Sequence, residues 1–150
     1  MNKSKKIVYV DMDNVLVDFP SGISRLEDAV VRKYEGRLDE VPGIFGLMYP
    51  LPDAVEGFQR LATCYDTYIL STAPWENPSA WSDKLLWVKR HLGEPAYKRL
   101  ILSHNKHLNT GDYLIDDRTK NGAGEFSGEL ILFGSDDYPN WAAVIRYLRA

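Results

Sequence analysis

Short apolar runs alternate with amphipathic helical patterns along this 150-residue chain. The apolar runs have the length of strands, and the first of them, residues 7–10, is rich in β-branched residues, as buried strands are. The segments between them repeat apolar residues three and four positions apart, as helices do. The predicted strands are residues 7–10, 65–71, 100–103, 113–115 and 129–133, and the predicted helices are residues 52–63, 79–92 and 140–148. This order predicts an α/β fold, a Rossmann-like parallel sheet of about five strands with helices on both faces.

The alternation breaks between Phe19 and Pro50. A helical pattern over residues 23–34 is followed by a segment with Gly and Pro, residues 42–50, which leads back to the sheet. We expect residues 20–50 to form a small helical cap inserted after the first strand, and residues 1–19 together with 51–150 to form the core. Such an insertion could be a lid that excludes water and selects substrates, or it could be a long packed crossover connection.

Charge and apolar content limit the partners and the compartment. The formal net charge of −3 favours neither a nucleic-acid polymer nor an anionic membrane as a partner. No apolar segment after the N-terminal lysines has the length of a signal region or of a bilayer crossing, which indicates a cytoplasmic protein. Cys64 is the single cysteine, so no disulfide forms within the chain, and we expect its side chain to be a small buried hydrophobic group.

Asp11 and Asp13 follow directly on the first predicted strand. Ligands of α/β sheets bind outside the carboxyl ends of the strands, and alternate residues of an extended chain point the same way. Two carboxylates that lie close together need a cation, or one of them keeps a proton. The pair therefore indicates a Mg²⁺ site built around a nucleophilic aspartate, although Asp-rich strand ends also occur on solvated surfaces.

Polar residues also follow three of the other predicted strands. Ser71 and Thr72 could donate hydrogen bonds to a phosphate group, or they could cap a helix. Lys106 could neutralise both a phosphate and the nucleophile, or it could be a surface lysine. Asp116 and Asp117 end an apolar strand, where half-buried carboxylates need a partner. Together, at the ends of alternating strands, these groups indicate a site for phosphoryl transfer, which needs positioning and charge neutralisation.

The four motifs, in this order, resemble those of the haloacid dehalogenase superfamily. Within it the chain is similar to the 5′(3′)-deoxyribonucleotidases in Asp-Met-Asp-x-Val-Leu-x-Asp-Phe from Asp11 and in Leu-Ile-Asp-Asp-Arg up to Arg118. Two further similarities are Tyr-Pro-Leu-Pro-x-Ala-Val-Glu from Tyr49 and the pair Trp87-Val88. The resemblance implies Mg²⁺ as the cofactor and a small phosphorylated substrate, a nucleoside monophosphate with the deoxy forms favoured.

The resemblance also implies a role for each site residue. Asp11 would be the nucleophile that takes the phosphoryl group, and Asp13 would be the general acid for the leaving alcohol and then the base for water. Lys106 would bridge the phosphate and the nucleophile. The implied metal ligands are Asp11, the backbone carbonyl of Asp13, Asp117 and, in support, Asp116; the implied substrate contacts are Ser71, Thr72 and Lys106 for the phosphate, with Phe19 and Phe45 for a base or sugar.

The chain departs from the family pattern at two positions. Asn14 stands where the superfamily often has Gly, and Asn tolerates a positive φ, so we expect the turn to survive. His104 stands two residues before Lys106, where we expect Arg in close relatives, so an extra contact to phosphate or base is not carried over. Two alternatives stay open: a phosphatase for another small phosphate such as a sugar phosphate or phosphorylated cofactor, and a non-catalytic module that binds phosphate or Mg²⁺. A phospho-acceptor receiver domain fits less well, since it would have no lid after the first strand.

Overall fold

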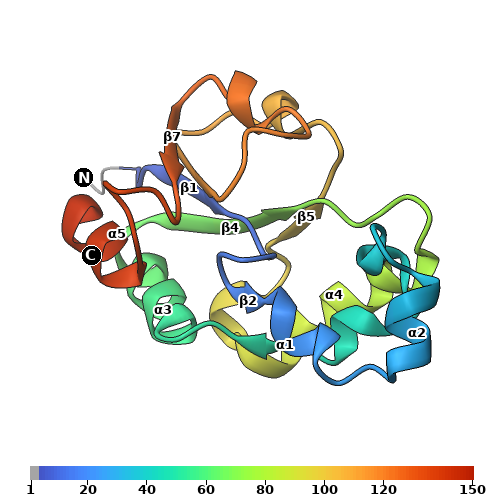
Figure 1. Ribbon diagram of the computed structural model, residues 1–150. Coiled ribbons are helices and arrows are strands. Elements are labelled where there is room, and N and C mark those ends of the chain that lie inside the picture. Colours follow the sequence, from blue (N-terminus) through green and yellow to red (C-terminus); the bar gives the residue numbers. More distant parts are fainter. Residues whose placement is uncertain (1–3) are drawn as a thin grey trace.

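A five-stranded parallel sheet is the centre of the fold (Figure 1). The computed structural model of the chain describes residues 4–150. The strand order is β5-β4-β1-β6-β7, with β1 at Ile7–Val10, β4 at Asp66–Ser71, β5 at Leu100–Leu102, β6 at Tyr113–Asp116 and β7 at Glu129–Leu132. Ile7 pairs with Asp66 on one side of β1, and Val8 pairs with Tyr113 on the other. The five predicted strands are confirmed, and their ends differ by no more than one residue.

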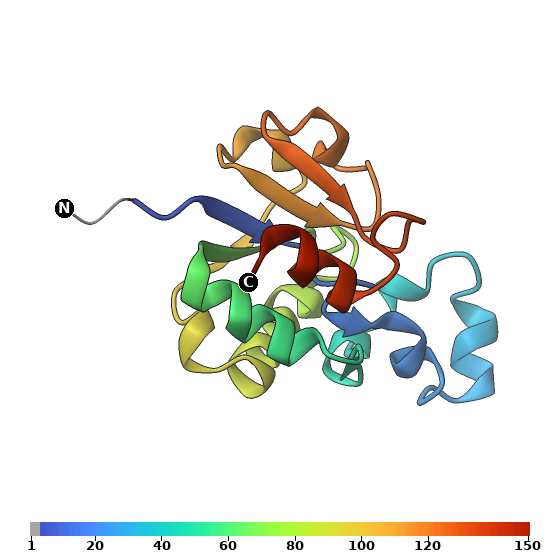
Figure 2. The same cartoon turned by 90° about the vertical axis from the view of Figure 1, so that its left-hand side faces the viewer.

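The two faces of the sheet are covered differently (Figures 1 and 2). The helices α3 (Ala54–Cys64), α4 (Pro78–His91) and α5 (Trp141–Leu148) contribute buried side chains to one core cluster with Val8 and Val10 of β1. Tyr9 points to the opposite face, where Phe126 packs edge-on against it beside the 3-10 helix η5 (Ala123–Glu125). The α/β prediction is confirmed, and the helices of the second face are short 3-10 turns. None of the helices within residues 4–150 is long and apolar enough to cross a membrane.

Residues 20–50, here called the cap segment, lie beside the carboxyl edge of the sheet (Figure 2). The antiparallel pair of β2 (Val17–Asp18) and β3 (Tyr49–Pro50) forms its base. Between these strands the elements are α1 (Phe19–Ile23), α2 (Asp28–Lys33), η1 (Leu38–Glu40) and η2 (Ile44–Gly46). The segment packs on α4 through η2, so α4 connects the cap segment to the sheet.

The prediction of one helix over residues 23–34 is wrong. Asp18 caps α1 by accepting a hydrogen bond from the backbone N–H of Ser21 at 3.2 Å, so this helix begins at Phe19 and ends at Ile23. The chain then turns before α2 begins at Asp28. The apolar residues whose spacing suggested one helix still pack against the core, and they are Ile23, Leu26, Val30 and Tyr34.

The prediction that Cys64 is buried is also wrong. Its side chain is exposed at the last residue of α3. The buried stripe of this helix runs through Ala54, Gly57, Phe58 and Leu61. Cys64 follows Leu61 by three positions, as a continuation of this stripe would, but it ends the helix and its side chain is exposed.

Candidate active site

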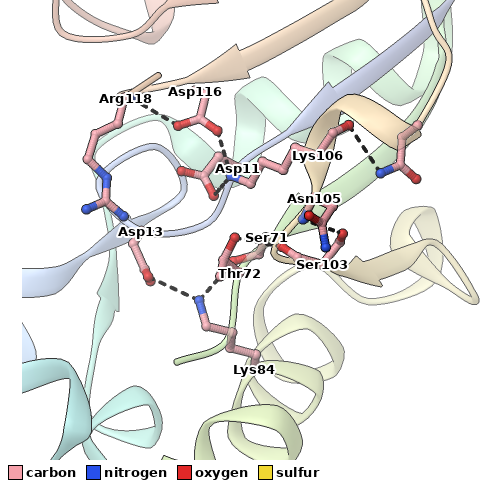
Figure 3. A network of polar contacts seen from close by, with 11 residues as sticks. Asp11, Asp13, Ser71, Thr72, Lys84, Ser103, Asn105, Lys106, Asp116 and Arg118 are labelled. Carbon is pink, nitrogen blue, oxygen red and sulfur yellow. Dashed lines mark hydrogen bonds and ion pairs between the residues drawn. The ribbon is translucent and has the colours of Figure 1, made fainter. Parts of the chain in front are cut away.

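Asp11 and Asp13 lie on a tight turn directly after β1. The carbonyl of Met12 accepts hydrogen bonds from the backbone N–H groups of residues 15–17 at 2.8 to 3.1 Å. Asn14 adopts a φ of 61°, so the expected turn is present, with Asn in place of Gly. Because the Met12 side chain is buried in the core, the carboxylates on either side of it point toward the carboxyl edge of the sheet (Figure 3).

Lys106 lies between two aspartates from neighbouring strands (Figure 3). Its Nζ donates to Asp11 Oδ1 at 3.0 Å and to Asp116 Oδ2 at 2.6 Å, and all three side chains are buried. The other oxygen of Asp116 accepts a hydrogen bond from the backbone N–H of Arg118 at 3.0 Å. Burial alone would lower the pKa of Lys106, but the two carboxylates raise it above its ordinary value. Lys106 is therefore a fixed positive charge against the predicted nucleophile.

The carboxylates of Asp11, Asp116 and Asp117 offer oxygens that lie within 4.8 Å of one another. Burial raises the pKa of Asp11 to about 7, with further contributions from the charges of Asp116 and Asp13. Burial and the charge of Asp11 raise the pKa of Asp117 to about 6. The positive charges near these carboxyl groups do not outweigh burial and the neighbouring carboxylates, and an oxygen-coordinated divalent cation would add positive charge between them. The donor set of this cluster therefore fits Mg²⁺.

Lys84 is a site residue that the sequence interpretation missed. Its side chain is 0% exposed, and its Nζ donates to Asp13 Oδ2 at 3.1 Å and to Ser71 Oγ at 2.9 Å (Figure 3). The same ammonium lies 4.5 Å from the ring centroid of Phe45. The second oxygen of Asp13, Oδ1, is buried and has no hydrogen-bond partner among residues 4–150. Lys84 therefore joins the predicted acid–base residue to the predicted phosphate-binding hydroxyl and leaves one carboxylate oxygen of Asp13 free.

The sequence did contain a signal for Lys84. It lies on the buried face of α4, together with Ala80, Trp87 and Val88. A lysine within an apolar stripe of a helix needs an anionic partner, because an unpaired buried charge is strongly destabilising. The helical spacing of Lys84 with Trp87 and Val88 could therefore have identified it.

Ser71 and Thr72 have different partners although they are adjacent. Ser71 ends β4 and reaches Lys84, whereas the hydroxyl of Thr72 donates to the carbonyl of Ser103 at 2.7 Å. That bond ties the end of β4 to the end of β5 (Figure 3). Among the two, Ser71 is the hydroxyl that the structure places beside the aspartates and lysines.

His104 packs against aromatic rings near this edge. Its ring centroid lies 5.8 Å from that of Trp75 and 6.2 Å from that of Trp81. Its Nε2 is buried and has no hydrogen-bond partner in the part of the chain that the structure describes. The contacts of His104 are thus aromatic, which is consistent with the loss of an arginine-type contact at this position.

A cavity of about 300 Å³ opens beside Asp13 and Asp117. Its lining residues are Asp13, Asn14, Phe19, Leu38, Asp39, Asp117 and Arg118. Leu38 and Asp39 come from η1, so the cap segment forms one wall. Phe45 is buried and packs edge-on against Phe19, with ring centroids 5.9 Å apart. Phe19 therefore faces the cavity, and Phe45 supports it from behind.

Comparisons with known proteins identify a family and agree with the fold. Residues 33–146 match the sequence profile of a family described as 5′ nucleotidase, deoxy (Pyrimidine), cytosolic type C protein. A protein of Vibrio phage KVP40 that bears the name of a 5′(3′)-deoxyribonucleotidase is 62% identical over 144 residues, which cover 96% of this chain and 85% of that protein. The human cytosolic-type 5′(3′)-deoxyribonucleotidase is 26% identical over 172 residues, which cover 92% of this chain and 78% of the human one.

A solved structure shows the same fold. The HAD-hydrolase YfnB from Bacillus subtilis, solved bound to magnesium, superposes with a TM-score of 0.67 at 11% identity. The match covers 99% of this chain and 100% of that one. The chain therefore has the fold of a haloacid dehalogenase-like hydrolase, and it belongs to the 5′ nucleotidase, deoxy (pyrimidine), cytosolic type C family, as a hydrolase that resembles the 5′(3′)-deoxyribonucleotidases.

Proposed function

We propose that this chain hydrolyses deoxynucleoside monophosphates through an aspartyl-phosphate intermediate on Asp11, with Mg²⁺ as its cofactor. The observation that carries the proposal is the pairing of two buried lysines with the two aspartates that follow β1. Lys106 contacts Asp11, while Lys84 contacts Asp13 and Ser71. The names of the phage and human relatives support the substrate class, and the name of the human relative supports the cytoplasm as the compartment.

Asp11 and Asp117 would hold the Mg²⁺ ion, together with the backbone carbonyl of Asp13. Asp116 would support them, because its two oxygens are already bonded to Lys106 and to the backbone of residue 118. When bound, the ion supplies positive charge to the phosphate oxygens and to the nucleophile. The raised pKa values of Asp11 and Asp117, caused mainly by burial, support this assignment, since the positive charge of a cation between them would favour the ionised form of both groups.

In the first step, a carboxylate oxygen of Asp11 forms a bond to phosphorus while the ester P–O bond breaks. The leaving alkoxide takes its proton from Asp13, whose Oδ1 has no other partner. In the second step, Asp13 removes a proton from water, and the water oxygen displaces Asp11 from phosphorus. Inorganic phosphate leaves and both aspartates return to their starting state. Lys106 offsets negative charge at Asp11 throughout, which such a transfer requires.

The cap segment supplies the part of the site that contacts the remainder of the substrate. We take residues 20–50 as a lid over a core formed by residues 1–19 and 51–150. Phe19 and Leu38 offer apolar surface for a base or sugar, and Phe45 supports Phe19 from behind. The cavity of about 300 Å³ lies at the small end of the range for ligand pockets. Because a cavity of that size also suits a smaller molecule, a sugar phosphate is the second candidate substrate.

Phosphate release across deoxynucleotides, ribonucleotides and sugar phosphates, with Mg²⁺ and with a chelator, tests the proposal. We expect deoxynucleoside monophosphates to be hydrolysed fastest, the chelator to stop the reaction, and Asp11→Asn to abolish it. Asp53→Asn is the matched control, because Asp53 is exposed and adopts a positive φ that Asn also tolerates. A preference for sugar phosphates would overturn the substrate assignment, and undiminished activity in Asp11→Asn would overturn the nucleophile.

A further inference from the structure

Asn77 is a buried polar residue that the proposed chemistry does not use. It lies between β4, which carries Ser71, and α4, which carries Lys84, and its side chain is 1% exposed. It occupies the N-cap position of α4, where Asn ordinarily accepts a hydrogen bond from the helix, yet its side chain makes no such bond. The Asn77 side chain is therefore bonded elsewhere.

Its amide nitrogen bonds to the cap segment, and its amide oxygen bonds to a serine of α4. Nδ2 of Asn77 donates to the carbonyl of Asp39 at 2.9 Å and to the carbonyl of Val41 at 3.0 Å. Oδ1 accepts a hydrogen bond from Ser79 Oγ at 2.7 Å, and Ser79 Oγ in turn accepts from the backbone N–H of Gly43 at 3.0 Å. Two carbonyl acceptors on one side and a hydroxyl donor on the other fix the orientation of the amide. Asn77 and Ser79 thus bind the backbone of the cap segment at three successive points.

The backbone held in this way is one wall of the cavity. Leu38 and Asp39 line the same cavity as Asp13 and Asp117. The wall combines an apolar side chain with an anionic one, so it suits an uncharged sugar and base better than a second phosphate group. A shift of η1 would change the fit of this part of a substrate while leaving Asp11, Lys106 and Lys84 in place.

We infer that Asn77 is a positioning residue that holds Leu38 and Asp39 over the catalytic aspartates and thereby sets substrate selection beyond the phosphate. The inference rests on the proposed function, because selection is measured through phosphate hydrolysis. It assigns no contact between Asn77 and the substrate. The effect passes through the hydrogen bonds to the carbonyls of residues 39 and 41.

The test compares wild type, Asn77→Ala and Ser79→Ala, with Asn140→Ala as a control. Asn140 caps α5 through the N–H of Ala143, so its loss lowers stability without touching the cap segment. Each variant is assayed with a deoxynucleoside monophosphate and with p-nitrophenyl phosphate, and amide hydrogen exchange is followed over residues 39–44. Ser79→Ala keeps the test decisive if Asn77→Ala does not fold.

We expect faster exchange at residues 39–44 in both Asn77→Ala and Ser79→Ala, with the amides of α3 unchanged. We expect KM for the deoxynucleotide to rise about tenfold in Asn77→Ala, the effect of losing one contact of about 1.4 kcal/mol, and less in Ser79→Ala. The kcat for p-nitrophenyl phosphate should stay within about twofold, and Asn140→Ala should leave the ratio of the two substrates unchanged. Unchanged exchange, or an equal loss on both substrates, would overturn the inference. A wild type that hydrolyses neither substrate would overturn the proposed function instead, and the exchange data would still decide whether Asn77 anchors the wall.

Discussion

Asp11→Asn should stabilise the metal-free protein at alkaline pH although it abolishes the proposed reaction. Burial raises the pKa of Asp11 to about 7 in the folded chain, from an ordinary value near 3.8. Between these two values the unfolded chain is ionised at Asp11 while the folded chain keeps the proton, so the free energy of unfolding falls as pH rises. A shift of about three units corresponds to about 4 kcal/mol, on the order of 1.4 kcal/mol per unit.

The Asp11→Asn variant has no titratable group at position 11, and it can keep the hydrogen bonds that are made there. An asparagine carbonyl at position 11 can still accept the hydrogen bond from Lys106, and its amide can donate to Asp117, which lies within hydrogen-bonding reach of Asp11. Without metal, the free energy of unfolding of the variant should match that of wild type near pH 4. At pH 8 it should be higher by about 2–4 kcal/mol, where the upper end is the whole effect of the pKa shift. For a chain of this size each kcal/mol shifts Tm by roughly 2–4 °C.

Urea unfolding of both proteins across pH 4 to 8, in chelator and in Mg²⁺, measures the difference. Mg²⁺ should stabilise wild type more than the variant, because binding to the folded state adds to its stability and the variant has lost a ligand. The reasoning would be refuted if Asp11→Asn were less stable than wild type at pH 8 in chelator. A difference that did not change with pH would refute it equally.

Three further substitutions test separate parts of the site. Lys84→Met should lower kcat/KM by roughly 10–100-fold, since hydrogen bonds to charged groups contribute about 1.5–3 kcal/mol. Lys89→Met, on the exposed face of α4, should have no effect. Equal activity of the two variants would show that Lys84 is not needed for the reaction. Asp117→Asn should weaken Mg²⁺ binding, measured by calorimetric titration, more than Asp116→Asn, because the oxygens of Asp116 are already bonded; the reverse order would make Asp116 the principal ligand. Phe19→Ala should reduce kcat/KM for deoxynucleotides about tenfold, since stacking of a base on an aromatic ring is worth about 1–3 kcal/mol. The kcat/KM for p-nitrophenyl phosphate should not change. An equal loss of kcat/KM on both substrates would show that Phe19 does not recognise the base.

The strands could be predicted because each is a short apolar run, and the three inner strands, β1, β4 and β6, are mostly buried in the sheet. The cap segment could not, because the spacing of Ile23, Leu26 and Val30 fits one helix as well as two short ones. What decides between these is Asp18, whose side chain caps α1 and makes it begin four residues earlier than the predicted helix. A side-chain cap of this kind competes with the apolar pattern and is not visible in it.

The site, too, could be predicted only in part. Asp11, Lys106, Asp116 and Asp117 could be expected together, because parallel strands bring their carboxyl ends to one edge, and the structure places them in contact. The partners of the buried Lys84 depend on how α4 packs across the sheet, which no local pattern encodes. The roles of these residues in catalysis stay predictions.

Phe45 illustrates the same limit for the substrate pocket. Its sequence position allowed it to face a base, but the structure buries it behind Phe19 and under Lys84. Replacing Phe45 with Ala would therefore remove a buried aromatic ring, at a cost of about 3–5 kcal/mol in stability. For that reason Phe19 is the better residue with which to test recognition of the base.

The central claim, that Asp11 carries the phosphoryl group, is tested most directly by trapping that intermediate. Asp13→Asn lacks the base that activates water, and p-nitrophenol leaves without an acid, so this variant should accumulate the intermediate when mixed with p-nitrophenyl phosphate and Mg²⁺. Mass spectrometry of the acid-quenched, digested protein should then find one phosphoryl group on the peptide that contains Asp11, and none in the double variant Asp11→Asn/Asp13→Asn. A phosphoryl group on another residue, or p-nitrophenol release with no phosphorylated peptide, would contradict the account.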